Sequence, residues 1–478
     1  MRKIKKALAL SLAMAMGLSL VACGGNDDAT TEATEAASDD ATEATEAASD
    51  DATEATEADA SATGAIAAPS TDGWDDSKKI YAYSWDEDFS KKMKVVLDKF
   101  PEYKDYVEFV TLGVSGTTDE YKTAIDTALT SGDKYPSLIP ADNDVAKYWS
   151  EDDTKTANLT DLGFTDDVMA NSYDFAKQYG TYNGELKAVT WQATAGSIFY
   201  RRDIAKEVLG SDDPETVQAA LADWDKFFET AEKLKGAGYK IVSGPSDVKY
   251  AIWDTQSQPW VTDDGSSEKL TLDGAVTEYL ETGKKIYDGG YSNNTALWDS
   301  SWAADMANDS KVFCYFGCPW FIGSMQGNGA VDGNWGAVTG PTSYHWGGTY
   351  VMVGKDTPNP ELCAFLLYEL TCDPDVGVDI TNKTGDCVNN KAANERLING
   401  ELSSDNAAQK FLGGQNPIEV WAASAEGINL SNTTYQDASI KAFIDEAATA
   451  YNSGTYTSVD DAVKYIEDKC ASELGISK

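Results

Sequence analysis

The chain has 478 residues and a formal net charge of −41, because 79 Asp and Glu residues outnumber 38 Lys and Arg residues. Such acidity argues against a nucleic-acid-binding protein and against docking on anionic lipid, since both partners are polyanions. The length also exceeds the roughly 300 residues that one hydrophobic core serves, so we expect two lobes in the folded part.

The N-terminus has the features of a secretory signal. Residues 1–6 carry four positive charges, and an uncharged stretch follows at 7–22. Its apolar part is too short for a transmembrane helix, which needs about 20 predominantly apolar residues. The stretch ends in Leu20-Val21-Ala22-Cys23, which resembles the bacterial lipobox, where the cysteine is acylated and the chain is cut before it. We predict a lipoprotein signal peptide over residues 1–22 and a lipid anchor at Cys23 on the outer face of the cell membrane; an ordinary signal with a chance cysteine is the alternative.

An acidic segment follows the cysteine. Residues 24–72 hold 14 Asp and Glu residues, no Lys or Arg, and no Leu, Phe, Tyr or Trp. Too few large apolar side chains are present to offset the entropy of the chain, so the segment is expected to be disordered. We predict a tether over residues 23–76. The first six residues contribute +4 and residues 24–72 contribute −14, which leaves −31 for residues 73–478.

Strand and helix patterns alternate along the rest of the chain. A buried strand is predicted at 79–85, and a helix with apolar positions from Phe89 to Phe100 ends at Pro101. A second strand at 106–112 precedes a capping box at 117–120, which begins another helix.

Further along, Asp223 is predicted to cap a helix that Gly236 closes. The remaining expected elements are strands at 197–200, 312–316, 335–338 and 350–353 and amphipathic helices around 440–447 and 463–466. Such alternation predicts mostly parallel sheets with covered faces.

Six cysteines remain besides Cys23, too few in this length for a disulfide scaffold. Cys372 and Cys387 are a candidate disulfide pair, and free buried thiols are the alternative.

Several short segments resemble one known family. They are Ser-Trp-Asp at 84–86, Tyr-Pro-Ser-Leu-Ile at 135–139 with Asp-Asn-Asp at 142–144, 198–204, 223–227, Gly-Cys-Pro-Trp at 317–320, 346–350 and 358–362. In this order, behind a lipobox and a tether, they resemble the extracellular solute-binding proteins of family 1, the maltose-binding type that serves sugar ABC transporters. The inserted cysteine of Gly-Cys-Pro-Trp departs from the Gly-Pro-Trp of that family.

The resemblance implies an α/β fold of the two-lobe, periplasmic-binding-protein-like type (type II), with a hinge and with lobes that interleave in sequence. Residues 77–478 would form the solute-binding domain, with lobe 1 at about 77–192 and 336–390 and lobe 2 at about 193–335 and 391–478. Periplasmic binding proteins are a known example of hinge closure. The implied partners are a carbohydrate ligand and the membrane permease subunits of an ABC transporter, and the implied state is a monomer.

The residues themselves favour binding without catalysis. His345 is the only histidine, which disfavours a zinc site, and no phosphate-cradling loop or nucleophile elbow is present. We therefore expect no cofactor, no metal and no catalytic residue. Carboxylates are abundant, so a surface glycan-acting enzyme stays an alternative.

Aromatic residues are the positive signal for a sugar ligand. The chain has 13 Trp and 24 Tyr residues against 14 Phe residues, and Trp and Tyr offer an apolar face with a polar edge. Candidate ligand-binding residues at predicted strand ends are Trp85, Trp320 and Trp346, followed by Trp191, Trp253, Trp260 and Trp302; core packing is the alternative for each. Asp86, Asp142 and Asn143 could bind sugar hydroxyls, or could form turns and helix caps.

Taken together, the sequence predicts a lipid-anchored, extracytoplasmic binding protein that captures a carbohydrate and delivers it to an ABC transporter. Among carbohydrates, an oligosaccharide is favoured. Three alternatives stay open: a binding protein for a peptide or a cationic small solute, a glycan-acting enzyme, and a carbohydrate-binding module without a transporter.

Overall fold

The computed structural model of the protein describes residues 64–263, 265 and 267–478. The predicted signal peptide, Cys23 and the tether up to residue 63 lie outside the described residues. The strands are β1 (Ile80–Ser84), β2 (Val107–Thr111), β3 (Pro136–Asp142), β4 (Thr181–Tyr182), β5 (Glu185–Leu186), β6 (Ser197–Arg201), β7 (Val261–Asp263), β8 (Glu268–Leu270), β9 (Cys314–Gly317), β10 (Trp335–Val338) and β11 (Thr349–Val353).

The α-helices surround these strands, and most are amphipathic. They are α1 (Asp88–Lys99), α2 (Asp119–Ser131), α3 (Asn143–Ser150), α4 (Asp174–Gly180), α5 (Arg202–Val208), α6 (Pro214–Ala220), α7 (Trp224–Gly236), α8 (Lys249–Trp253), α9 (Gly274–Gly289), α10 (Ser300–Ala304), α11 (Phe321–Gly327), α12 (Pro360–Thr371), α13 (Pro374–Thr384), α14 (Lys391–Arg396), α15 (Ala407–Phe411), α16 (Pro417–Glu426), α17 (Asp437–Asn452) and α18 (Val459–Lys469). None of the described helices combines the length and the apolar character that a bilayer crossing needs.

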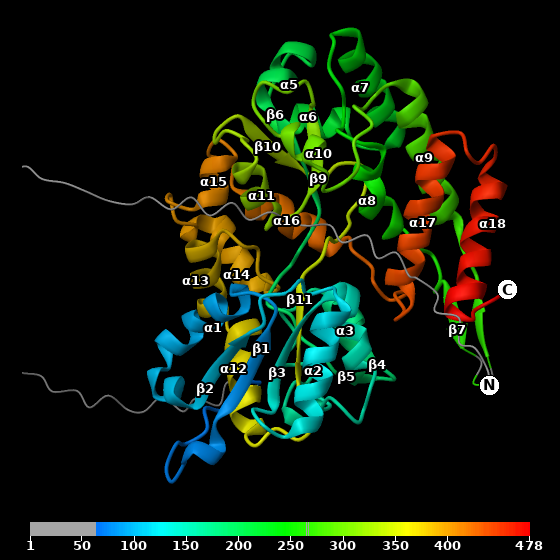
Figure 1. Cartoon of the computed structure of the whole chain (residues 1–478). Coiled ribbons are helices and arrows are strands. Elements are labelled where there is room, and N and C mark those ends of the chain that lie inside the picture. Colours follow the sequence, from blue (N-terminus) through cyan, green and yellow to red (C-terminus); the bar gives the residue numbers. More distant parts are fainter. Residues whose placement is uncertain (1–63, 264, 266) are drawn as a thin grey trace, which may run out of the picture. The chain divides into compact units, whose positions relative to one another are not determined.

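The first lobe is built on a four-stranded sheet in the order β11-β3-β1-β2 (Figure 1). Strand β1 pairs in parallel with β2 and β3, and β11 runs antiparallel to β3. Helix α1 packs here because Phe89, Met93 and Val96 fall on one face and are fully buried. The predicted strands at 79–85, 106–112 and 350–353 and the helix that ends before Pro101 are confirmed.

The second lobe is built on a three-stranded sheet in the order β10-β6-β9, and both pairings are antiparallel. The expectation of mostly parallel sheets is therefore wrong for this lobe. Its strands pair across long helical insertions, so no single crossover helix between neighbouring strands fixes their direction. The predicted strand at 335–338 is confirmed as β10, and the predicted 312–316 strand is β9, shifted slightly along the chain.

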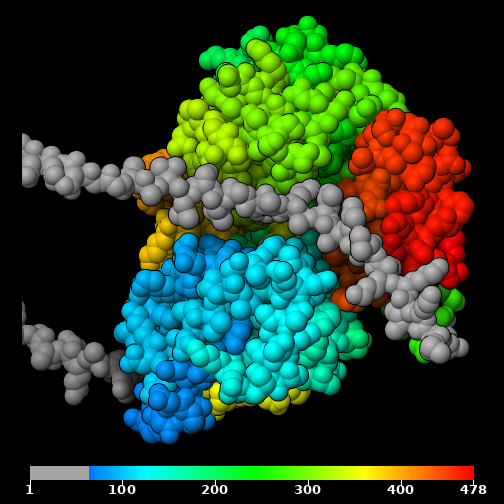
Figure 2. Space-filling model, in the orientation of Figure 1, coloured from blue at the N-terminus to red at the C-terminus, as the bar shows by residue number. Residues whose placement is uncertain are grey.

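Two connecting segments run side by side between the sheets. The backbone N–H of Trp346 donates to the carbonyl of Thr194 at 3.1 Å, and that of Gly196 donates to the carbonyl of Tyr344 at 2.6 Å. Figure 2 shows the blue and cyan atoms of the first lobe on one side and the green atoms of the second lobe on the other. The α/β fold with two lobes that interleave in sequence is thus confirmed.

Two expected boundaries need correction. The return to the first lobe was expected at 336, but that residue lies inside β10, which pairs with β6 of the second lobe. The tether was expected to extend to residue 76, but Trp74 packs edge-on against Tyr106, with ring centroids 5.0 Å apart, and Ile66 is half-buried against the core. These two side chains supply the apolar surface that the preceding segment lacks. The other lobe boundaries stay a prediction.

Local signals at helix ends were largely correct. Asp223 caps α7 by accepting from the backbone N–H of Lys226 at 2.7 Å, as predicted. Helix α7 ends at Gly236, although the left-handed glycine beyond it is Gly238. The cap of α2 is Thr118 rather than Thr117, one residue later than the capping-box spacing indicates.

The cysteines in the described part of the chain are all free and buried, namely Cys314, Cys318, Cys363, Cys372, Cys387 and Cys470. The candidate disulfide between Cys372 and Cys387 is therefore absent, and the alternative of buried thiols holds.

Candidate functional site

A cavity of about 480 Å³ lies between the two lobes, at the ends of their strands. The first lobe supplies one wall and the segment around α11 supplies the other, while the connecting segments form the base. The lining residues are Trp85, Asp86, Asp88, Lys92, Asp142, Gln192, Pro319, Trp320, Ile322, Gly323, Gln326, Gly347, Gly348, Thr349, Thr384, Gly385, Asp386, Ala407 and Ala408.

One tryptophan from each lobe reaches this cavity. Trp85 directly follows β1, and its ring covers Gly116, where a Cβ atom would lie only 2.6 Å from the Cδ2 atom of the indole. Trp320 follows Pro319, and its Nε1 atom donates to the carbonyl oxygen of Trp346 at 3.1 Å. Both rings are half-buried, so each is fixed by its neighbours while part of its surface stays free.

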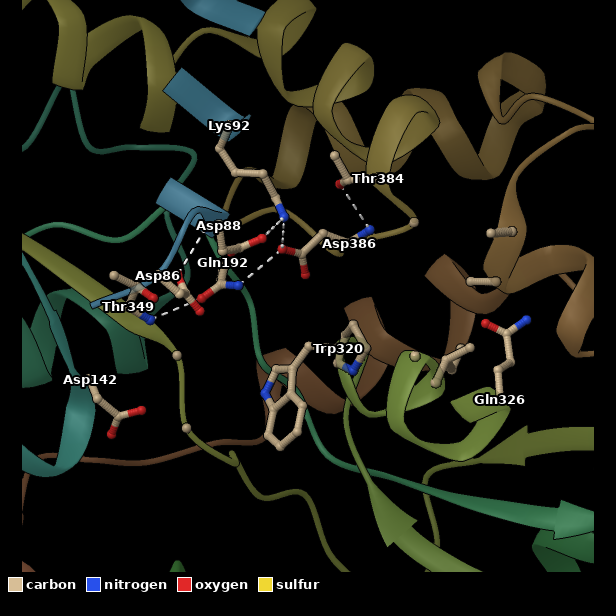
Figure 3. A pocket seen from close by; sticks show the side chains of 18 of the residues that line it. Asp86, Asp88, Lys92, Asp142, Gln192, Trp320, Gln326, Thr349, Thr384 and Asp386 are labelled. Carbon is tan, nitrogen blue, oxygen red and sulfur yellow. Dashed lines mark hydrogen bonds and ion pairs between the residues drawn. The ribbon is translucent and has the colours of Figure 1, made fainter. Parts of the chain in front are cut away.

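A hydrogen-bonded chain of polar side chains faces Trp320 (Figure 3). The Nζ atom of Lys92 lies 2.7 Å from Asp88 and 3.5 Å from Asp386. Gln192 donates to Asp386 at 3.0 Å, and its carbonyl oxygen accepts from the backbone N–H of Thr349 at 2.9 Å. These bonds link α1, the loop after α13, the connecting segment and β11. We call the linked residues, Asp88, Lys92, Gln192, Thr349 and Asp386, the polar wall.

The lysine in this wall is held as a cation. Burial works against the charged amine, but Asp386 and Asp88 outweigh it and hold the pKa of Lys92 above its usual range. Burial raises the pKa of Asp386 even though Lys92 opposes the rise. The positive charge of Lys92 is thus shared between two carboxylates and is not free to bind an anion.

Asp142 and Asp86 are the other two carboxyl groups on the cavity wall. Burial, with a further contribution from the charge of Asp144, raises the pKa of Asp142 to about 7. Burial also raises the pKa of Asp86. Asp142 additionally caps α3, where it accepts from the backbone N–H of Asp144 at 2.9 Å, so the expected cap and the expected cavity position coincide.

The lining as a whole is acidic and rich in hydrogen-bond acceptors. Four carboxyl groups, those of Asp86, Asp88, Asp142 and Asp386, stand against the single paired amine of Lys92. An anionic ligand would be repelled and would find no free cation. A neutral polyhydroxylated ligand could donate hydroxyl protons to these acceptors and stack on the indoles.

Two of the predicted ligand-binding residues lie just behind the wall. Trp346 is 5% exposed and stacks on Tyr250, with ring centroids 4.9 Å apart. Asn143 is buried, and its amide donates to the Nε2 atom of His345 at 3.0 Å, while the Nδ1 atom of that histidine lies 2.6 Å from Asp254. Neither Trp346 nor Asn143 lines the cavity. The adjacent residues in the sequence, Gly347 and Asp142, line it instead.

The remaining predicted tryptophans lie in the core and line no part of the cavity. Trp191 packs on Phe89, and Trp253 packs on Tyr279. Trp302 and Trp260 donate their indole N–H groups to Asp247 and Asp273, at 2.7 and 3.0 Å. For these four residues the structure favours the alternative of core packing over ligand contact.

Sequence reasoning missed the polar wall, including Asp88, Lys92, Gln192, Thr349 and Asp386. Gln192 follows buried Trp191 at a bend, so no strand alternation in the sequence could have placed its side chain at the cavity. The pairing of Lys92 with Asp386 joins residues 294 positions apart and had no local signal.

Comparison with known proteins identifies the family. The model of the bacterial extracellular solute-binding protein family matches residues 96–410. The chain belongs to this family. A search of curated proteins by sequence finds no match. The predicted membership of an extracellular solute-binding family is therefore confirmed.

Solved structures share the fold at low sequence identity. One extracellular solute-binding protein of family 1 aligns with a TM-score of 0.68 and 17% identity, over 81% of this chain and 97% of that one. The galacto-N-biose/lacto-N-biose I-binding protein of an ABC transporter from Bifidobacterium longum gives 0.64 and 16%, over 84% and 100%. An extracellular solute-binding protein from Staphylococcus aureus in complex with maltose gives 0.58 and 16%, over 82% and 98%.

Proposed function

We propose that this solute-binding protein captures a neutral carbohydrate between its two lobes and delivers it to the permease of an ABC transporter. We favour an oligosaccharide as the ligand. The observation that carries the proposal is the cavity wall, where Trp85 and Trp320 come from opposite lobes and four carboxyl groups supply hydrogen-bond acceptors. Closure of the lobes would bury a sugar ring between an indole and a carboxylate.

The similar structures support a sugar ligand. Their bound molecules include lacto-N-biose, β-1,6-galactobiose and maltose. The low identity leaves the choice of sugar to the residues of this chain. Its paired lysine and four carboxyl groups favour a neutral sugar over an acidic one.

We further propose that acylated Cys23 anchors the protein to the membrane, so that the acidic segment after it holds the binding domain off the surface. A dually or triply acylated cysteine would anchor stably, whereas one acyl chain binds only marginally. Family membership supports an extracytoplasmic location.

A cationic small solute or a peptide is the second candidate, because the cavity is acidic. Thermal unfolding in the presence of neutral oligosaccharides, spermidine and dipeptides separates the candidates. A ligand at 100 times its Kd adds about 2.7 kcal/mol to the free energy of unfolding, which is easily measured. We expect a neutral oligosaccharide to raise the melting temperature; stabilisation by spermidine or dipeptides alone would refute the proposal. Release of shortened glycans during incubation would point to the glycan-acting enzyme instead.

A further inference from the structure

A second hollow, of about 320 Å³, lies in the second lobe between the segment 294–298, α9 and α17. Trp298 forms part of its wall. The same ring also borders the aromatic wall of the main cavity, because its centroid lies 6.3 Å from that of Trp320 and the two ring planes are within 13° of parallel. The hollow therefore adjoins the main cavity through these two tryptophans.

The conformation of Trp298 is unusual for a bulky residue. Its φ angle is +71°, in the left-handed region that favours glycine and asparagine, and 48% of the residue is exposed. One part of the indole packs against an aromatic cluster of Trp302, Trp320, Phe321 and Trp346, and the rest is open to a ligand. Backbone strain of this kind is characteristic of ligand-binding positions, where the surrounding structure holds it in place.

Hydrogen bonds fix the start of the segment that carries Trp298. The carbonyl of Ser243 accepts from the backbone N–H groups of Asn293 and Thr295, at 2.9 and 3.3 Å, and the hydroxyls of Ser243 and Thr295 are 2.6 Å apart. Buried Asp247 in turn accepts from the N–H of Ser243 at 2.9 Å. The ring of Trp298 itself packs against Trp302 and Trp346, with ring centroids 5.2 and 5.7 Å apart, so it is positioned before any ligand arrives, which lowers the entropy lost on binding.

The lysine that lines the hollow, Lys249, is paired with a carboxylate. The Nζ atom of Lys249 lies 2.8 Å from Asp445, and the hydroxyl of Tyr279 donates to the same carboxylate at 2.9 Å. The remaining wall includes Tyr287 and the exposed Thr449. An indole face, a phenol and a hydroxyl around a paired charge fit a neutral polyhydroxylated ring.

We infer that Trp298 and this hollow form a second saccharide subsite, which takes the units of an oligosaccharide that extend past Trp320. The inference rests on the proposed function and narrows its ligand class, because it requires an oligosaccharide too long to fit in the main cavity alone. A ligand confined to the main cavity would leave the exposed part of this indole without a contact.

Titration calorimetry of the mature protein tests this subsite, with maltose through maltohexaose and cellobiose through cellohexaose as probes. In the wild type, affinity is expected to rise with chain length. Trp298→Asn keeps a residue that tolerates the left-handed backbone, so the relief of strain should offset part of the stability lost with the ring contacts to Trp302 and Trp346. This variant should lose roughly tenfold in affinity for the longest chain bound, and less for shorter chains. Trp298→Phe retains a ring face and should retain most of the gain with length.

A second variant leaves Trp298 in place. Thr449→Trp on α17 fills the hollow from its exposed side and should reduce the affinity for long chains while disaccharides bind as before. An unchanged length profile in both Trp298→Asn and Thr449→Trp overturns the subsite and leaves the proposed function intact. Loss of stability in Trp298→Asn, with the length profile retained, returns the indole to a packing role. A wild-type affinity that does not rise beyond the disaccharide also overturns the subsite and leaves the proposed function intact.

Discussion

The indole Nε1 atom of Trp320 donates a 3.1 Å hydrogen bond to the carbonyl oxygen of Trp346. One residue lines the cavity, and the other is buried behind it against Tyr250. The bond ties a cavity residue from the second lobe to the segment that connects the lobes. The position of the cavity-lining ring therefore depends on a residue that does not itself line the cavity.

This relationship predicts different effects for the two tryptophans. Trp320→Ala should weaken binding of the stabilising oligosaccharide by about 30-fold, because a central aromatic contact contributes about 2 kcal/mol, and should change stability little. Trp346→Ala should instead lower the free energy of unfolding by roughly 3–5 kcal/mol, as for a core tryptophan. Calorimetry and denaturant unfolding measure the two effects.

Trp302→Ala is the matched control, since this residue is 1% exposed and lies in the same aromatic cluster. It should behave as Trp346→Ala does. Normal affinity in folded Trp320→Ala would remove this residue from the binding site.

The polar wall gives a second prediction. Lys92→Met should lower the free energy of unfolding by about 3 kcal/mol or more, because it leaves the buried Asp386 without its counter-charge. The loss should shrink as the pH falls, because burial raises the pKa of Asp386 and its protonated, uncharged form needs no counter-charge. Lys94→Met, on the exposed face of the same helix, should have no measurable effect. Equal stability of the two variants would show that Lys92 is dispensable.

Asp142 gives a pH-dependent prediction. Its pKa of about 7 lies above the usual value, so the unfolding free energy of the ligand-free protein should fall as the pH rises from about 4 to 7. Because the ionised carboxylate is the better acceptor of hydroxyl protons, oligosaccharide affinity should increase between about pH 6 and 8. Titrations across this range should show the increase in the wild type and none in Asp142→Asn. A pH dependence that persists in the variant would assign it to another group.

The lipid anchor is tested by Cys23→Ser. This variant should appear in the medium or remain unprocessed, while the purified protein binds its ligand with wild-type affinity. Fractionation of cells, followed by immunoblotting, measures the distribution. Membrane partitioning identical to that of the wild type would contradict acylation at this cysteine.

Much of the fold could be predicted because its signals are local. The apolar positions of α1 are a few residues apart, Asp223 caps the nearby N–H of Lys226, and the structure has both features. Strand direction in the second sheet was mispredicted because β6 pairs with strands more than 100 residues away. Composition alone also placed Ile66 and Trp74 in the tether, although both pack on the first lobe.

The site was harder to predict than the fold. Trp85, Asp86, Asp142 and Trp320 were selected from the sequence and do line the cavity. Trp191, Trp346 and Asn143 were also selected, but they are buried and do not line it. The preference for tryptophan drew attention to the buried Trp191 and Trp346, whereas their neighbours Gln192 and Gly347 line the cavity. The ion pair of Lys92 with Asp386 forms only when distant segments meet.

The central claim is that an oligosaccharide is captured between the two lobes. Small-angle X-ray scattering of the mature protein, with and without a saturating oligosaccharide identified by thermal unfolding, tests it most directly, since the N-terminal segment is the same in both samples. The account predicts a smaller radius of gyration with ligand, because hinge closure brings the lobes together. An unchanged radius of gyration at calorimetrically confirmed saturation would contradict capture by closure and would indicate a rigid binding module.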